Sequence, residues 1–349
     1  MHRANVALPM KSTLVVLSTL AAAALNAAPA PITSATAPYA VHGSVERLDP
    51  ALDALLAPGA VMEKLAEGFN WSEGPVWMPT QGALLFSDVP ENRVYRWKDG
   101  EGISVFLEPS GFTGSVYHGR ERGSNGLTLD RSGRLVLCQH GDRRVARLAA
   151  DGKSFETIAD RIGSKRFSSP NDLCFDRAGN LFFTDPPYGL PSDVKQETEF
   201  NGVYRLATDG KLTVIDATMA RPNGVALSPD EKTLYVGSTE DKEPYVKAFS
   251  LNVDGTVASS KIFFDGSALM KAGRHGGFDG LRVDAVGNIW TSGPGGVLII
   301  SPAGKHLGSL LTGRQTANCA FGGADGKTLY ITADDLLLRI KTSVTDAGR

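Results

Sequence analysis

Cysteine is scarce in this sequence, with three among 349 residues. Cys138, Cys174 and Cys319 are odd in number and lack the spacing of a zinc site, so they predict neither a disulfide framework nor a thiolate metal centre. Each lies in an apolar stretch typical of a strand. We therefore expect buried thiols, with a Cys138–Cys174 bond as the alternative in an oxidising compartment.

Long apolar runs are also missing beyond the first thirty residues. Lys11 precedes an uncharged run at 13–25, and small residues follow it. This order is typical of a secretory signal peptide, and the run is too short to span a bilayer comfortably. We expect residues 1–30 to be a signal peptide and residues 31–58 to be a flexible lead with a short helix. The mature protein is then exported, with a bacterial periplasm as the expected compartment and no stable membrane insertion after signal cleavage.

Charge of either sign is not in excess, since 36 Lys and Arg stand against 38 Asp and Glu, for a net charge of −2. Without a basic stripe, a nucleic-acid partner is not expected. The sequence also lacks the Gly-x-Ser-x-Gly motif, which argues against a serine esterase. A small-molecule partner and a monomer or weak dimer are the expectations that remain.

What the sequence does contain is a short phrase that returns six times. Each copy opens on an acid or amide, followed by an apolar stretch, a turn and a second apolar stretch, which is the pattern of a β-hairpin. These opening residues, here called the anchors, are 39 to 56 residues apart: Glu73, Asn125, Asn171, Asn223, Asp279 and Asn318. A period of this length indicates a β-propeller.

The six copies predict an all-β fold, a six-bladed β-propeller of four-stranded antiparallel blades over residues 59–341, with a tail at 342–349. A third apolar run usually follows each hairpin, and outer fourth runs are visible at 155–159 and 212–216. The last copy lacks a fourth run, so an N-terminal strand at 60–66 is expected to close the last blade. The segment 45–56 is expected to be a short helix with a packing role.

In a propeller the anchors face one another around the axis, beside the loops that return from each second strand. Two anchors are carboxylates, Glu73 and Asp279, and the others are amides. Such oxygens are the ligands that hard cations prefer, and the lack of His and Cys argues against a zinc site of the usual kind. Without a cation, two converging carboxylates would repel each other. Turn formation is the alternative explanation for Asn125 and Asn318.

Five motifs also occur in the order of a known family. They are Glu73-Gly74-Pro75-Val76-Trp77, Ser169-Pro170-Asn171-Asp172, Asp185-Pro186-Pro187-Tyr188-Gly189, Arg221-Pro222-Asn223-Gly224 and Asp279-Gly280-Leu281. With these motifs, residues 60–341 resemble the senescence-marker-protein/gluconolactonase family of regucalcin-like six-bladed propellers. The resemblance implies one divalent cation bound by Glu73, Asn223 and Asp279, with Asn171 as a further ligand near the substrate. Ca²⁺ is the first choice, and Mg²⁺, Mn²⁺ or Zn²⁺ are alternatives.

The resemblance further implies the hydrolysis of a sugar lactone. The cation would polarise the lactone carbonyl, and Asp279 would take a proton from the attacking water. Asn171, Asn125, His140 and Tyr188 are expected to hold the sugar hydroxyls. This chain has Ser169 where some family members place an Arg that contacts substrate.

Other functions stay open at this point. One is a different metal-dependent esterase or an organophosphate hydrolase on the same propeller. Another is a non-catalytic propeller that binds a sugar or a protein, and a third is a calcium ion that only stabilises the blades. The fold alone does not separate them, but retention of both acids together with Asn171 and Asn223 favours an enzyme. The loops at 110–123 and 192–200 do not reveal which lactone is preferred.

Overall fold

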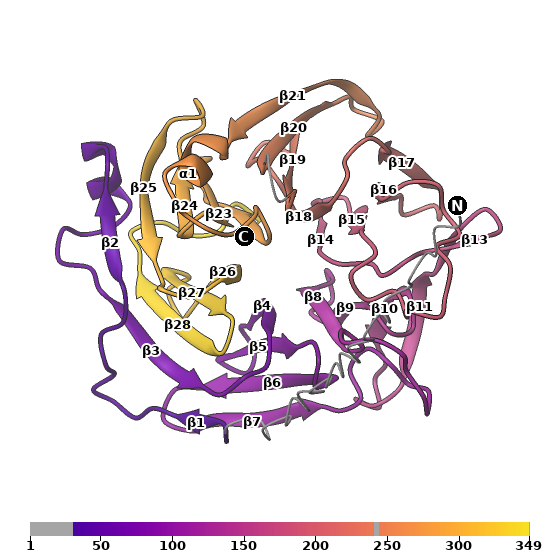
Figure 1. Cartoon of the computed structure of the whole chain (residues 1–349), viewed down its shortest axis with the longest axis horizontal. Coiled ribbons are helices and arrows are strands. Elements are labelled where there is room, and N and C mark those ends of the chain that lie inside the picture. The colour runs from indigo at the N-terminus through magenta and orange to yellow at the C-terminus, as the bar shows by residue number, and fades with distance from the viewer. Residues whose placement is uncertain (1–30, 241–243, 349) are drawn as a thin grey trace, which may run out of the picture.

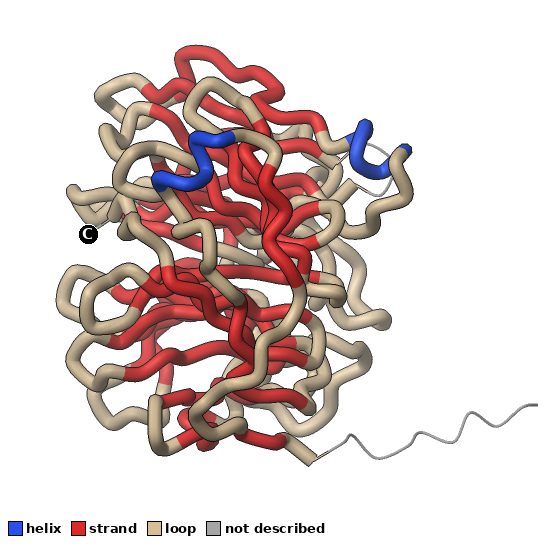
Figure 2. The backbone as a smooth tube through the Cα atoms, turned by 90° about the vertical axis from the view of Figure 1, so that its left-hand side faces the viewer, coloured by secondary structure: helices blue, strands red, loops and turns tan. Residues whose placement is uncertain are grey.

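A computed structural model describes residues 31–240 and 244–348. The expected signal peptide at 1–30 lies outside this range, so export stays a prediction. Nearly all the regular structure is strand (Figure 2), and the helical segments are η1 (Pro50–Ala54) and α1 (Ser267–Lys271). Within the described ranges, no helix has the length and apolar character needed to cross a membrane.

Six antiparallel sheets form a ring of blades around one axis, which confirms the predicted propeller (Figure 1). The first two blades, from the axis outward, are β4 (Ser72–Met78), β5 (Ala83–Asp88), β6 (Arg93–Lys98), β7 (Gly102–Leu107), then β8 (Ser124–Leu129), β9 (Leu135–Gln139), β10 (Arg144–Leu148), β11 (Phe155–Ala159). The third and fourth are β14 (Leu173–Phe175), β15 (Leu181–Asp185), β16 (Gly202–Leu206), β17 (Leu212–Asp216), then β18 (Pro222–Leu227), β19 (Thr233–Ser238), β20 (Tyr245–Leu251), β21 (Val257–Asp265). A hairpin of β12 (Arg161–Ile162) and β13 (Lys165–Arg166) follows the second blade.

The last two blades each gain strands from the N-terminal segment. The fifth consists of β22 (Leu281–Val283), β23 (Ile289–Gly293), β24 (Gly296–Ile300), β25 (His306–Leu311) and β2 (Ser44–Arg47). The sixth consists of β26 (Thr316–Gly322), β27 (Thr328–Ala333), β28 (Leu336–Lys341), β3 (Met62–Glu67) and β1 (Thr33–Ser34). Because β3 pairs antiparallel with β28, the N-terminal strand closes the ring as the sequence predicts.

The lead at 31–58 differs in detail from the expectation. β1 pairs with β3 and β2 pairs with β25, so this segment covers the outer edges of two blades. Covering an edge satisfies backbone groups that would otherwise offer a template for pairing. The expected helix at 45–56 is reduced to the 3₁₀ segment η1, because residues 44–47 pair as a strand and Asp49 then caps the turn by accepting the Ala51 N–H at 2.8 Å.

Apolar side chains fill the spaces between neighbouring blades. At the junction of the sixth and first blades, Trp77 stacks on Tyr330 with ring centroids 5.5 Å apart, and the buried Trp97 packs beside them. This aromatic contact joins the two ends of the chain into one core. The three cysteines are free thiols in this structure. Cys138 and Cys319 are buried, as expected, whereas Cys174 is half-buried.

The anchors stand at the start of the innermost strands, and most lie in bulges. The pairing of β4 with β5 shifts register between Glu73 and Val76, and β8, β18 and β26 shift at their own anchors. A bulge bends the strand and redirects its side chain. Four of the anchors are followed by a glycine, which permits close approach of the next blade: a Cβ on Gly224 would lie 2.2 Å from the Asp279 carbonyl oxygen. The repeated anchor-Gly phrase therefore forms a tight ring of inner strands.

Candidate active site

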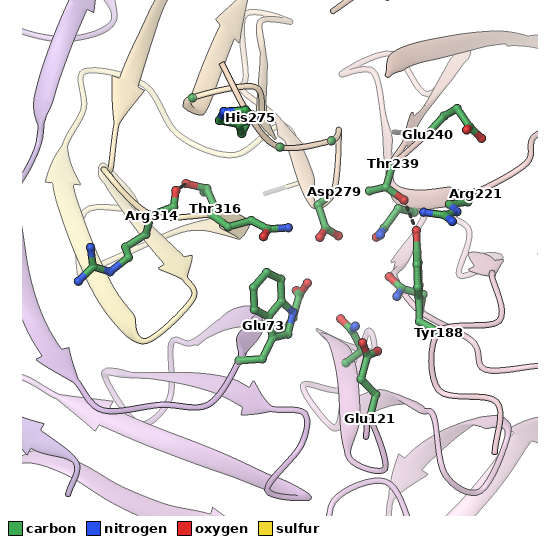
Figure 3. Close-up of a pocket in the computed structure, with 18 of the residues that line it drawn as sticks. Glu73, Glu121, Tyr188, Arg221, Thr239, Glu240, His275, Asp279, Arg314 and Thr316 are labelled. Atoms are coloured by element: carbon green, nitrogen blue, oxygen red, sulfur yellow. Dashed lines mark hydrogen bonds between the residues drawn. The ribbon is translucent and has the colours of Figure 1, made fainter. Parts of the chain in front are cut away.

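A cavity of about 680 Å³ opens over one end of the propeller axis. Five of the six anchors line it: Glu73, Asn125, Asn171, Asn223 and Asp279. Figure 3 shows the Glu73 and Asp279 side chains pointing toward a common centre from opposite sides of the cavity. The structure therefore brings together all four residues predicted to bind a cation, although their roles stay predictions.

The two anchor carboxylates are almost completely buried. Glu73 is 1% exposed, and burial together with the neighbouring Asp172 carboxylate raises its pKa to about 8. Burial and the charge of Glu73 likewise raise the pKa of Asp279 well above the ordinary aspartate value. A bound cation would oppose both shifts, because its positive charge stabilises the ionised form of each carboxyl group.

Several oxygens in the cavity have no hydrogen-bond partner. In the part of the chain that the structure describes, this is true of the Oδ1 atoms of Asn125, Asn171, Asn223 and Asp279. Leaving a buried acceptor unsatisfied costs about 1–3 kcal/mol, so four in one place indicate a missing ligand. Carboxylate and amide oxygens fit a hard divalent cation. The described residues contain no group of three or more His, Cys, Asp or Glu that could hold a metal ion, so a cation in this cavity would need the amide oxygens as ligands.

The sixth anchor lies below the cavity rather than in its wall. Asn318 donates from Nδ2 to Glu73 Oε2 at 3.2 Å and to Asp172 Oδ2 at 3.4 Å. Asp172 in turn lies 3.8 Å from the Arg282 guanidinium, deep in the channel. Asn318 therefore holds Glu73 in place, while Arg282 balances the charge of Asp172. Sequence reasoning had not assigned a role to Asp172 or Arg282.

Two acids at the ends of second strands hold the segments that lead into the anchors. Asp88 accepts hydrogen bonds from the Asn70 and Trp71 N–H groups at 3.0 and 3.2 Å. Asp185 accepts those of Ser168 and Ser169 at 2.9 and 2.7 Å. Ser169 itself is buried, donates to the Pro186 carbonyl at 2.6 Å and accepts the Gly189 N–H. It thus supports the 185–189 turn and does not line the cavity.

Asp185 predicts a measurable dependence of stability on pH. Burial raises its pKa to about 7, against the opposing effect of its two backbone hydrogen bonds. Between its ordinary pKa of about 4 and this value, the folded state holds a proton that the unfolded state has lost, so the free energy of unfolding falls as pH rises. Asp185→Asn should remove up to about 1.4 kcal/mol per pH unit of that slope. Urea unfolding in EDTA from pH 4.5 to 8 measures it, and parallel curves for the two proteins would contradict the assignment.

The substrate-binding predictions are divided by the structure. Asn125, Asn171 and Tyr188 line the cavity, and the Tyr188 hydroxyl contacts Thr239 Oγ1 (Figure 3). Burial raises the pKa of the Tyr188 phenol, so the hydroxyl keeps its proton as a donor. His140 does not line the cavity. It is completely buried behind the wall, with Nδ1 3.4 Å from Glu121 Oε2.

Sequence reasoning missed the residues that complete the wall. They are Trp71, Glu121, Arg221, Glu240, Met270, His275, Arg314, Gln315 and Thr316, whereas Thr239 lies in one of the returning loops that were expected beside the anchors. Most come from the connections that enter each inner strand, a few residues before an anchor. The positions of the anchors could have predicted these residues, because a connection that ends at an anchor must cross the face of the propeller on which the anchors lie.

Fold and site together define a six-bladed propeller with an oxygen-lined cavity over its axis. The SMP-30/Gluconolactonase/LRE-like region matches residues 71–335, and the chain belongs to this family. It is 39% identical over 315 residues to a gluconolactonase of Zymomonas mobilis, covering 86% of each chain. It is 29% identical over 265 residues to a pentonolactonase of Haloferax volcanii, covering 74% of this chain and 80% of the relative.

A solved structure agrees with this assignment. The gluconolactonase of Xanthomonas campestris superposes with a TM-score of 0.75 at 31% identity. The match covers 91% of this chain and 99% of that one. The resemblance seen in the motifs is thereby confirmed over the whole propeller.

Proposed function

We propose that this protein is a metal-dependent sugar lactonase. Its family, together with the gluconolactonase and pentonolactonase among its relatives, supports a lactone as the substrate class. We further propose that Glu73, Asn171, Asn223 and Asp279 bind one divalent cation, with Ca²⁺ preferred. The observation that carries this proposal is the set of buried, unpartnered oxygens that converge on the cavity beside two carboxylates.

Each residue of the proposed site then has a defined role. When bound, the cation supplies a Lewis acid for the lactone carbonyl and charge stabilisation for the developing oxyanion. Asp279 Oδ1, which is buried and unpartnered among the described residues, accepts a proton from the attacking water. The new bond joins the water oxygen to the carbonyl carbon, the ring C–O bond breaks, and the ring oxygen takes the proton that Asp279 had accepted and leaves as a hydroxyl. Asn125, Asn171 and Tyr188 orient the sugar.

Acid release from glucono-1,5-lactone tests this function. The mature protein is stripped with EDTA, and half of the sample is restored with Ca²⁺. A pH indicator follows the rate, with spontaneous hydrolysis subtracted. We expect turnover in the restored sample and at least about a 100-fold lower rate in the stripped one. Tight Ca²⁺ binding without turnover of this or other aldonolactones and aryl esters would favour a binding propeller instead.

A further inference from the structure

Glu121 is an acid of the cavity wall for which the lactonase proposal has no role. It lies in the connection between β7 and β8, and its side chain is 32% exposed. Figure 3 shows it reaching from below toward the centre of the cavity, where the side chains of Glu73 and Asp279 also point. A carboxylate in this position is an acceptor of hydrogen bonds.

The surroundings of Glu121 leave its carboxylate short of donors. In the described ranges, His140 is the basic side chain that lies within ion-pair distance, with Nδ1 3.4 Å from Oε2. The two groups lie close together, but they do not form a hydrogen bond. Both ring nitrogens of the buried His140 consequently have no hydrogen-bond partner among the described residues. Such contacts often tighten only when substrate is bound.

His140 is nevertheless fixed in position. Its backbone N–H donates to the Gly123 carbonyl at 3.1 Å. Gly189 lies directly on its ring, where an added Cβ would be 2.3 Å from His140 Cβ. The Tyr117 hydroxyl donates to the Gly189 carbonyl at 2.6 Å and contacts the Glu121 carbonyl at 3.1 Å, which ties the two loops together. These contacts hold the imidazole of His140 beside the Glu121 carboxylate, where Nδ1 can orient that carboxylate.

We propose that Glu121 is a specificity-determining residue that accepts hydrogen bonds from ring hydroxyls of the lactone, and that His140 is its positioning residue. The inference rests on the proposed lactonase function. Vicinal hydroxyls offer the donors that this carboxylate lacks. The substrate class is accordingly a polyhydroxylated lactone rather than a simple aliphatic one.

Glu121→Gln tests the carboxylate. Its kcat/KM for glucono-1,5-lactone should fall about 10- to 100-fold, because a charge-assisted hydrogen bond is lost. Most of the loss should appear in KM, since the contact is made in the ground state as well. Turnover of δ-valerolactone, which has the same ring without hydroxyls, should change by less than about threefold, and so should Ca²⁺ affinity measured by calorimetry. Glu156→Gln, an exposed acid on β11, is the matched control.

Two substitutions separate positioning from structure at His140. Asn can place its Nδ2 donor where Nδ1 stands, so His140→Asn should keep at least about a third of wild-type kcat/KM on the sugar lactone. His140→Leu removes the donor and should reproduce the KM increase of Glu121→Gln. If His140→Leu does not fold, the KM values of His140→Asn and Glu121→Gln decide the question.

The outcomes are distinct. A wild-type protein that hydrolyses no lactone overturns the lactonase function itself. An active wild type with unchanged Glu121→Gln kinetics overturns this inference alone. A tenfold loss of Ca²⁺ affinity in Glu121→Gln would make Glu121 a cation ligand, and a parallel loss on δ-valerolactone would exclude hydroxyl recognition. If the wild type does not turn over δ-valerolactone, a lowered kcat at constant KM on the sugar lactone overturns the inference.

Discussion

Asp279→Asn is expected to lower kcat for glucono-1,5-lactone by about 10³-fold at saturating Ca²⁺, since general-base catalysis contributes about 10²–10⁴. Asn has the shape of Asp and keeps one carbonyl oxygen for the cation. The backbone N–H of residue 279, which donates to Ser292 Oγ at 2.9 Å, is unaffected. The substitution therefore removes the proton acceptor with little change to the surrounding strand.

The measurement is an initial rate at a Ca²⁺ concentration shown by calorimetry to saturate the variant. Asp230→Asn is the matched control, because Asp230 lies in the exposed turn between β18 and β19, bonded to Ser228 Oγ at 2.7 Å. It should retain the wild-type rate. A variant at position 279 that keeps more than about a tenth of wild-type kcat would show that another group takes the proton.

Glu73→Gln is expected to be more stable than the wild type in the absence of metal and less stable than the wild type when Ca²⁺ is bound. Burial raises the pKa of Glu73, so in the wild type without metal the free energy of unfolding falls as pH rises from about 4.5 to about 8. Gln does not titrate. Its carbonyl oxygen can accept both hydrogen bonds now made to Oε2, from the Gly74 N–H and the Asn318 amide. At pH 8 in EDTA the variant should therefore be the more stable protein.

With Ca²⁺ the order should be opposite, because the variant has lost a charged ligand. A 100-fold weaker affinity lowers the stabilisation by bound Ca²⁺ by about 2.7 kcal/mol. Thermal unfolding at pH 8, with EDTA and with excess Ca²⁺, gives the four values required. Equal Ca²⁺-induced increments in the two proteins would exclude Glu73 as a ligand. A variant less stable than the wild type in EDTA would contradict the raised pKa.

The ring of blades could be predicted because its signal is local and repeated. Each of the six anchor phrases carries its own hairpin, and the number of phrases gives the number of blades. The closing strand was also predictable, since the last copy lacked an outer run and 60–66 was unassigned. The strand pairing of the lead at 31–58 was less predictable. Whether a short segment pairs with a sheet edge depends on which edge remains uncovered, and that follows from the closed ring.

The candidate site was predicted in its inner part and missed at its rim. Glu73, Asn171, Asn223 and Asp279 repeat with the blades, so one periodic pattern placed them together. Glu121 belongs to no repeat, and the role proposed for it depends on His140, which approaches from the end of β9. His140 was expected on the cavity wall, but the structure places it behind the wall, because the 185–189 turn covers its ring.

The sequence by itself determined the number of blades, the closure of the ring and the oxygen-rich character of the axis, because these follow from residues that recur at a fixed period. Only the tertiary structure decided which oxygens are buried without a partner, which anchor lies beneath the others, and which loop acids reach the cavity. Those properties depend on contacts between blades. Asn318 meets Glu73 across 245 positions of sequence, and no local pattern records such a contact.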